Sequence, residues 1–144
     1  MDRPLLVALV VLGSGCGDDA PAPADNVPVY NGCTGSLYVD RSAPSANRTV
    51  SFGGANGSGP FAYSPPCITI AAGQTVTFEG SFNVHPLGPG TSPTVDPGAP
   101  NTPIPRLSSD AMPRVMVTFP APGLYPYLCE LHYMGGMNGV VRVR

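Results

Sequence analysis

The chain has little positive charge and little histidine. Its 144 residues include only 7 Lys and Arg together and only 2 His, and the formal net charge is -2 at pH 7. So few basic residues give no basis for binding nucleic acid, which requires a basic patch or stripe. The Gly-rich segment 53–59 lacks both the Lys and the following helical pattern of a phosphate-binding loop. The sequence therefore predicts neither a nucleic-acid partner nor a P-loop.

The N-terminal apolar run is also short. It extends from Leu5 to Leu12, after a start that includes Arg3, and it cannot span a bilayer. Its length is instead typical of the apolar region of a signal peptide. The sequence therefore predicts export, with residues 1–15 forming the signal.

A cysteine follows this run directly. Leu12-Gly-Ser-Gly-Cys16 resembles the lipobox of bacterial lipoproteins, which implies that Cys16 is lipidated and becomes the mature N-terminus. Gly13 departs from the pattern, so cleavage near Gly15 or Gly17 to give a soluble exported protein stays open. Residues 16–26 would carry the lipid and a semi-rigid Pro/Ala tether. We expect a protein of the periplasm or cell surface that contacts a membrane through this lipid alone.

Short alternating runs of apolar and polar residues dominate the remainder. They cover 36–39, 48–52, 67–71, 74–78, 114–119, 124–128 and 139–144. Period-two patterning with Gly and Pro between the runs favours a β-sandwich, and no helical period persists beyond about one turn. The alternation places Ile68, Ile70, Val76, Phe78, Val115, Val117 and Phe119 on the core side, and Thr69, Thr75, Thr77 and Thr118 on the outer side. We predict one all-β domain over residues 27–144.

Two stretches interrupt this pattern. Residues 42–60 are rich in Gly, Ser and Asn, and residues 86–113 contain eight prolines. Proline at this density excludes a long helix and any central strand. Pro126, inside a predicted strand, implies a sheet edge, a bulge or an unpaired position. The sequence does not specify the structure of either stretch.

A thiolate, an imidazole and a thioether lie close together near the C-terminus, at Cys129, His132 and Met137. Copper that alternates between two oxidation states needs soft sulfur for the reduced ion and nitrogen for the oxidised ion. The other histidine, His85, follows the strand-like run 74–84, where a folded sheet could bring it alongside. These four residues form the candidate ligand set.

The pattern Cys-x2-His-x4-Met, preceded by Pro-Gly-x-Tyr-x-Tyr, resembles the copper loop and closing strand of plastocyanin and pseudoazurin, members of the cupredoxins. The segment 68–78 followed by His85 is similar to the strands before the first histidine ligand of that family. The resemblance covers about half of the chain. It implies a Greek-key β-sandwich with long Pro/Gly-rich loops that binds one type 1 blue copper ion through His85, Cys129 and His132, with Met137 as a long axial ligand.

Other interpretations of the motif fit less well. Structural zinc requires four Cys or His ligands and usually a second paired motif, and a Cys-His nucleophile requires a third orienting group. Copper enzymes need further histidines for a second, substrate-binding centre, and none remains. Met134 competes for the axial position, but His-x-Met is a shorter loop than His-x4-Met. We therefore expect a protein that is not an enzyme.

The resemblance also implies a role. Cupredoxins carry single electrons, and the edge of His132 would reach the surface within an apolar docking patch for a transient redox protein partner. The expected patch contains Pro86, Leu87, Leu131, Tyr133 and Met134. The alternative is a copper-binding or copper-delivery protein in which electron transfer is incidental. We expect a monomer, and the sequence identifies neither the partner nor the direction of electron flow.

The cysteine count then predicts one disulfide. The chain has 4 Cys, and assigning Cys16 to lipid and Cys129 to copper leaves Cys33 and Cys67. Export places these two thiols in an oxidising environment. We therefore expect Cys33 and Cys67 to be bonded to each other.

Overall fold

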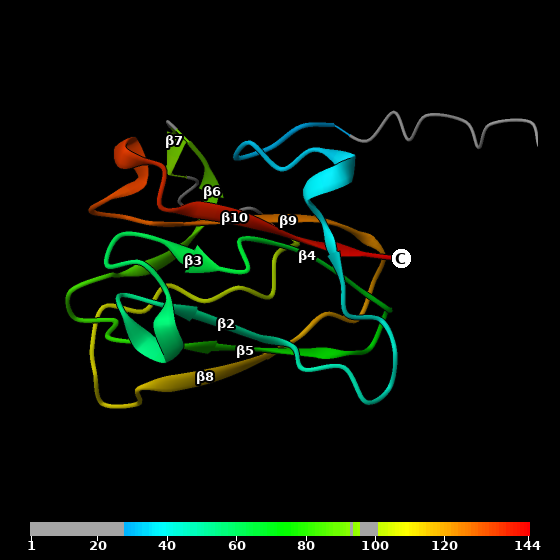
Figure 1. Cartoon of the computed structure of the whole chain (residues 1–144), viewed down its shortest axis with the longest axis horizontal. Coiled ribbons are helices and arrows are strands. Elements are labelled where there is room, and N and C mark those ends of the chain that lie inside the picture. The colour runs from blue at the N-terminus through cyan, green and yellow to red at the C-terminus, as the bar shows by residue number, and fades with distance from the viewer. Residues whose placement is uncertain (1–27, 93, 96–100) are drawn as a thin grey trace, which may run out of the picture.

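Six of the seven alternating runs form strands in the computed structural model, which describes residues 28–92, 94–95 and 101–144. The exception is the run 36–39, of which only Val39 lies in a strand, because its first two residues belong to a 3-10 turn. The predicted signal, Cys16 and the tether lie outside the described residues. The strands are β1 (Val39–Asp40), β2 (Thr49–Phe52), β3 (Tyr63–Ser64), β4 (Cys67–Ile70), β5 (Thr75–Glu79), β6 (Leu87–Thr91), β7 (Thr94–Val95), β8 (Arg114–Thr118), β9 (Gly123–Cys129) and β10 (Asn138–Val143) (Figure 1). Three single turns of 3-10 helix, η1 (Gly35–Leu37), η2 (Ala55–Gly57) and η3 (Tyr133–Gly135), complete the regular structure of this part of the chain.

The strands form two mixed sheets. One has the order β1-β4-β10-β9-β6-β7 and the other the order β3-β2-β5-β8. In Figure 1, β9 and β10 lie above β2, β5 and β8. Aromatic and aliphatic side chains from both sheets share one core, which includes Phe52, Phe78 and Tyr127. The all-β sandwich predicted from the alternation is confirmed.

No helix in the described ranges is long and apolar enough to cross a membrane.

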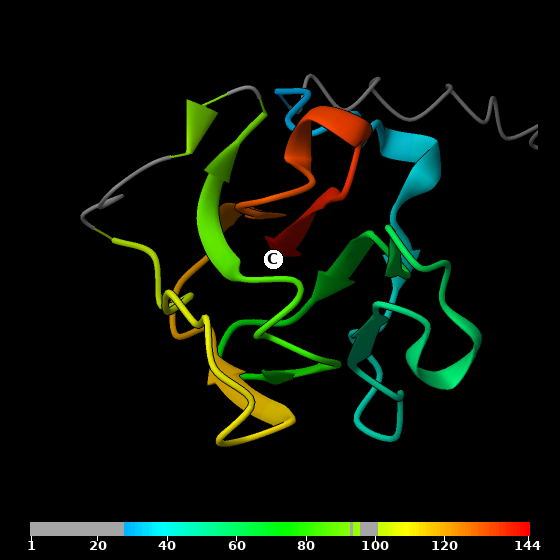
Figure 2. The ribbon, with the colours of Figure 1, turned by 90° about the vertical axis from the view of Figure 1, so that its left-hand side faces the viewer.

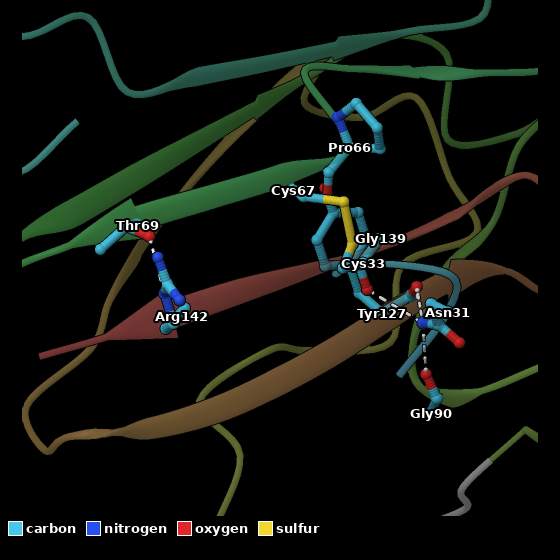
Figure 3. Close-up of a disulfide and its surroundings, with 9 residues drawn as sticks. All are labelled: Asn31, Cys33, Pro66, Cys67, Thr69, Gly90, Tyr127, Gly139 and Arg142. Carbon is cyan, nitrogen blue, oxygen red and sulfur yellow. Dashed lines mark hydrogen bonds between the residues drawn. A yellow bond between two sulfur atoms is a disulfide. The ribbon is translucent and has the colours of Figure 1, made fainter. Parts of the chain in front are cut away.

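An N-terminal arm, residues 28–38, precedes β1 and packs on the outer face of the larger sheet. Cys33 is bonded to Cys67 of β4 across a sequence separation of 34, so the predicted disulfide is confirmed (Figure 3). Both cysteines are buried in a second small cluster with Val140. The arm explains why Thr69, expected on the solvent side, is buried. Its Oγ1 accepts a hydrogen bond from Arg142 Nε at 2.9 Å, beneath the arm.

Asn31 fastens this arm to three strands. Its Nδ2 lies 3.1 Å from the carbonyl oxygen of Gly90 and 2.9 Å from those of Tyr127 and Gly139 (Figure 3). Its Oδ1 accepts a hydrogen bond from the Ser92 amide at 2.8 Å. The backbone of Asn31 has φ 50°, a left-handed conformation in which Asn is enriched. One side chain therefore connects the arm to β6, β9 and β10.

Pro126 occupies an unpaired position in the sheet. The sequence had left three possibilities open, namely a sheet edge, a bulge or an unpaired position. It lies opposite Val140 of β10, but the Val140 amide donates to the Pro66 carbonyl instead. On the other side, β6 pairs with β9 only over Tyr127–Cys129. No hydrogen bond of the sheet therefore requires an N–H at Pro126.

Candidate metal centre

Three donor atoms, from His85, Cys129 and His132, lie close together. The segments that carry them, 81–86 and 129–137, lie at the end of the sandwich that faces the viewer in Figure 2. Cys129 Sγ lies 3.3 Å from His132 Nδ1 and 3.9 Å from His85 Nδ1, and the two Nδ1 atoms are 3.1 Å apart. A point equidistant from these atoms lies about 2 Å from each, close to the usual length of a metal bond to nitrogen or sulfur in proteins. In the described ranges, this is the one group of three or more His, Cys, Asp or Glu side chains so arranged. The triangle therefore fits a single transition-metal ion.

Strand pairing brings His85 to Cys129. Leu87, at the start of β6, is in register with Cys129, at the end of β9. The Glu130 amide donates to the Pro86 carbonyl at 2.8 Å, which continues the pairing past the strand ends. The His85 amide donates to the Ser81 carbonyl at 3.0 Å, which closes the turn between β5 and β6. Residues distant in sequence are thus held side by side by backbone hydrogen bonds.

The loop from Cys129 to Met137 folds back on itself. The His132 amide donates to the Cys129 carbonyl at 3.2 Å, and the Cys129 amide donates to the Met137 carbonyl at 2.9 Å. Gly136, with φ 90°, makes the tight return after η3. Met137 is fully buried in the core cluster that contains Cys129, whereas Met134 is 75% exposed. The longer loop therefore returns its methionine to the interior, and the shorter one does not.

Burial shifts the pKa of two of the three donors, Cys129 and His85. Cys129 is fully buried and His85 is 5% exposed. Burial raises the pKa of the Cys129 thiol, against the hydrogen bonds from the Leu131 and His132 amides, which lower it. Burial, together with the charge of His132, lowers the pKa of His85. The metal-free site thus favours the neutral forms of Cys129 and His85, so a metal ion that binds the thiolate must displace a proton.

The segment 53–62 covers the two histidines, a contact that the sequence does not predict. Gly53 has φ 63°, and a Cβ there would lie 2.6 Å from His85 Cδ2, so only glycine allows this approach. The ring of Phe61 lies 4.9 Å from that of His132 and 6.0 Å from that of His85, measured between centroids. A Gly-rich stretch shows that a loop is present, but its sequence does not show which side chain it covers.

The predicted apolar patch requires correction. Pro86 and Leu87 are buried, because Leu87 pairs with Cys129 on one side and forms an isolated bridge with Leu107 on the other. Leu131 and Met134 are exposed, and Tyr133 is partly exposed. Phe61 and Val84 are exposed as well. The ring of Phe61 lies against both histidines, and Val84 directly precedes His85 in the chain. We call Phe61, Val84, Leu131, Tyr133 and Met134 the apolar rim.

One protein family and several solved structures are similar to this chain. The sequence model of a family described as copper binding proteins, plastocyanin/azurin family, matches residues 48–144. Similar solved structures include a Cu-containing nitrite reductase from Thermus scotoductus SA-01 (26% identity, TM-score 0.43), oxidised plastocyanin from Dryopteris crassirhizoma (24%, 0.45) and native pseudoazurin from Hyphomicrobium denitrificans (23%, 0.49). Each alignment covers 67% of this chain. It covers 22% of the reductase, 99% of the plastocyanin and 73% of the pseudoazurin. This chain thus spans about a fifth of the length of the reductase. The residues matched by the family model include all three donors of the triangle.

Proposed function

Because this chain belongs to the plastocyanin/azurin family of copper-binding proteins, we propose that it carries single electrons between redox proteins through one type 1 copper ion. The observation that carries the proposal is the buried triangle of one thiol sulfur and two imidazole nitrogens. One Cys and two His with a weak axial Met is the ligand set of copper electron-transfer sites. When bound, copper supplies a one-electron couple between its +1 and +2 states.

The residues of the chain would hold the ion and keep water away. His85, Cys129 and His132 are the proposed equatorial ligands, and Met137 is the proposed axial ligand. Backbone hydrogen bonds fix the segments that carry them, so little rearrangement is expected when the charge of the site changes. His132, which is partly exposed at the apolar rim, is the proposed route for the electron to a partner.

Burial also favours electron transfer over copper delivery. A delivery protein must pass its metal to another site, which requires donors that a partner can reach. Here Cys129 is fully buried and His85 nearly so. Both histidines of the chain already belong to the triangle, so none remains for the second copper centre that catalysis would require. The similarity to the nitrite reductase extends over only 22% of that enzyme, so we do not infer an enzymatic role from it.

Electron self-exchange tests the proposal without a known partner. In mixtures of reduced and oxidised protein, line broadening in NMR spectra measures how fast copies exchange electrons. We expect Leu131→Lys to slow self-exchange by roughly tenfold, because two apolar rims must meet and like charges would then face each other. Met116→Lys is the control, since Met116 is 70% exposed but lies on β8. Equal effects of the two variants would contradict a role for the rim.

Substitution of Met137 and of Met134 provides a second test, which concerns the axial ligand. Met137→Leu should raise the reduction potential, because it removes a weak donor to the oxidised ion and the axial ligand tunes the potential. Met134→Leu should leave the potential and the absorption spectrum almost unchanged. Redox titration of both copper-loaded variants measures the difference. Equal shifts would remove Met137 from the ligand set.

Location forms the last part of the proposal. Residues 1–15 are proposed as the signal, 16–26 as the lipidated Cys16 and tether, and 27–144 as the copper domain. Two or three acyl chains on Cys16 would hold the protein firmly on a membrane. The native protein should therefore fractionate with membranes and be released by detergent but not by salt. A soluble exported protein with an N-terminus beyond Cys16 would contradict the lipid anchor and leave the copper site unaffected.

A further inference from the structure

The Pro-rich stretch without a predicted structure runs alongside the candidate metal centre. Part of it, residues 104–110, contacts both segments that carry the buried donors, and we call this part the brace (yellow in Figures 1 and 2). At its middle, Leu107 and Leu87 exchange two backbone hydrogen bonds of 2.9 Å. Leu87 follows His85 by two residues, so the brace is fixed to the chain directly after a donor. Ile104, at the start of the brace, is buried in the main core.

Asp110, at the end of the brace, accepts two hydrogen bonds from the turn that precedes His85. Its Oδ1 accepts a hydrogen bond from the Asn83 amide at 2.9 Å, and its Oδ2 accepts one from Ser81 Oγ at 2.9 Å. The same turn is closed by the His85 amide, which donates to the Ser81 carbonyl. The bonds from Asn83 and Ser81 lower the pKa of Asp110, so the carboxylate is ionised at neutral pH. Two charge-assisted hydrogen bonds thus hold the turn from outside.

Arg106 connects the brace to the other donor segment. Its Nη1 lies 3.3 Å from Glu130 Oε1, and Glu130 directly follows Cys129. This oxygen is buried without an aligned hydrogen bond, so the contact is an ion pair. The Glu130 amide in turn donates to the Pro86 carbonyl, next to His85. The brace therefore connects the His85 turn and the end of β9 by side chains as well as by backbone.

We propose that Asp110 is a positioning residue for His85, and that the brace holds the His85 turn against Cys129 in a geometry ready for copper. The inference rests on the proposed copper site. Asp110 is exposed and contributes nothing to the hydrophobic core. Its two hydrogen bonds act on the turn that sets where the imidazole of His85 lies, and outer groups that orient a ligand typically contribute 10- to 100-fold to metal affinity.

The test compares Asp110→Ala with Asp40→Ala. Asp40, the last residue of β1, is a matched control, because it is also exposed and its Oδ1 also accepts a backbone hydrogen bond, from the Ser42 amide at 2.8 Å. It is in register with Thr69 of β4, away from the donors. We expect Asp110→Ala to weaken Cu(II) binding by about 10- to 100-fold in competition titrations with a chelator, and Asp40→Ala to leave it unchanged. Thermal unfolding of the two metal-free variants should be similar.

Two milder variants keep the test decisive if Asp110→Ala does not fold. Asp110→Asn retains one acceptor oxygen and should recover part of the affinity, and Ser81→Ala removes one donor and should lose part of it. Equal Cu(II) affinity of wild type and all the Asp110 and Ser81 variants would overturn the inference. So would a loss of affinity matched by Asp40→Ala. A wild type that binds no copper would instead contradict the proposed function itself.

Discussion

Copper-loaded Cys129→Ser protein is expected to be almost colourless, whereas the oxidised wild type should be intensely blue or green. Strong visible absorption by such a site arises from charge transfer between the thiolate and Cu(II), and Cys129 is the one free cysteine among the described residues. Serine is close to cysteine in size, so the sandwich should stay folded. The variant retains both imidazoles, which can still bind copper weakly.

Absorption spectra of both proteins, before and after a mild reductant, measure this prediction. The wild type should bleach on reduction and recover its colour on reoxidation. Far-ultraviolet circular dichroism should show the same strand content in the wild type and the variant. A colourless, copper-loaded wild type would contradict the assignment of Cys129 as a ligand, and a coloured Cys129→Ser protein would do so as well.

Removal of the Cys33–Cys67 disulfide should cause the largest change in stability. The bond closes a loop with a sequence separation of 34, and its loss from a loop of this length lowers the free energy of unfolding by about 4 kcal/mol on the chain-entropy model. The arm that it fastens also buries Val140 and the outer side of β4. For a domain of this size, we expect the midpoint of thermal unfolding to fall by roughly 10–20 °C.

Urea unfolding of a Cys33→Ser, Cys67→Ser double variant measures the loss. The comparison is best made in the metal-free Cys129→Ser background, where no other cysteine of the folded domain can react. Adding a reductant to the parent of this background should reproduce the effect, and adding it to the double variant should change nothing. A difference below about 1 kcal/mol would contradict the chain-entropy estimate for this loop.

Short-range patterns in the sequence predicted those features that depend on residues close together in the chain. The period of two in runs such as 74–78 reports which side of a strand is buried, and β5 follows it, with Val76 and Phe78 in the core. The spacing of Cys129 and His132 placed both donors on one short loop. The cysteine count predicted the disulfide, because export and the copper motif left two thiols to pair.

Contacts between distant segments could not be predicted in this way. Leu87 was expected in the surface patch that the family resemblance implies, but it is buried and forms a bridge with Leu107, which lies within a Pro-rich stretch. Proline density argues against a long helix there, but the expectation that it also excludes a central strand was wrong, because β6 pairs with β9 on one side and with β7 on the other. Nor does proline density indicate which strand the segment contacts. Phe61 and Asp110 were missed for the same reason, since their roles depend on where loops meet after folding.

The disulfide also determines how mechanical force would enter the domain. A force applied to the chain before residue 28 would act first on the hydrogen bonds of Asn31, which can break and reform. The force would then act on Cys33. From there the covalent bond passes the tension directly to Cys67 at the start of β4. Residues 34–66, which include β1, β2 and β3, lie within the closed loop and carry no tension. The disulfide therefore protects three of the ten described strands from being unravelled by traction at the N-terminal end.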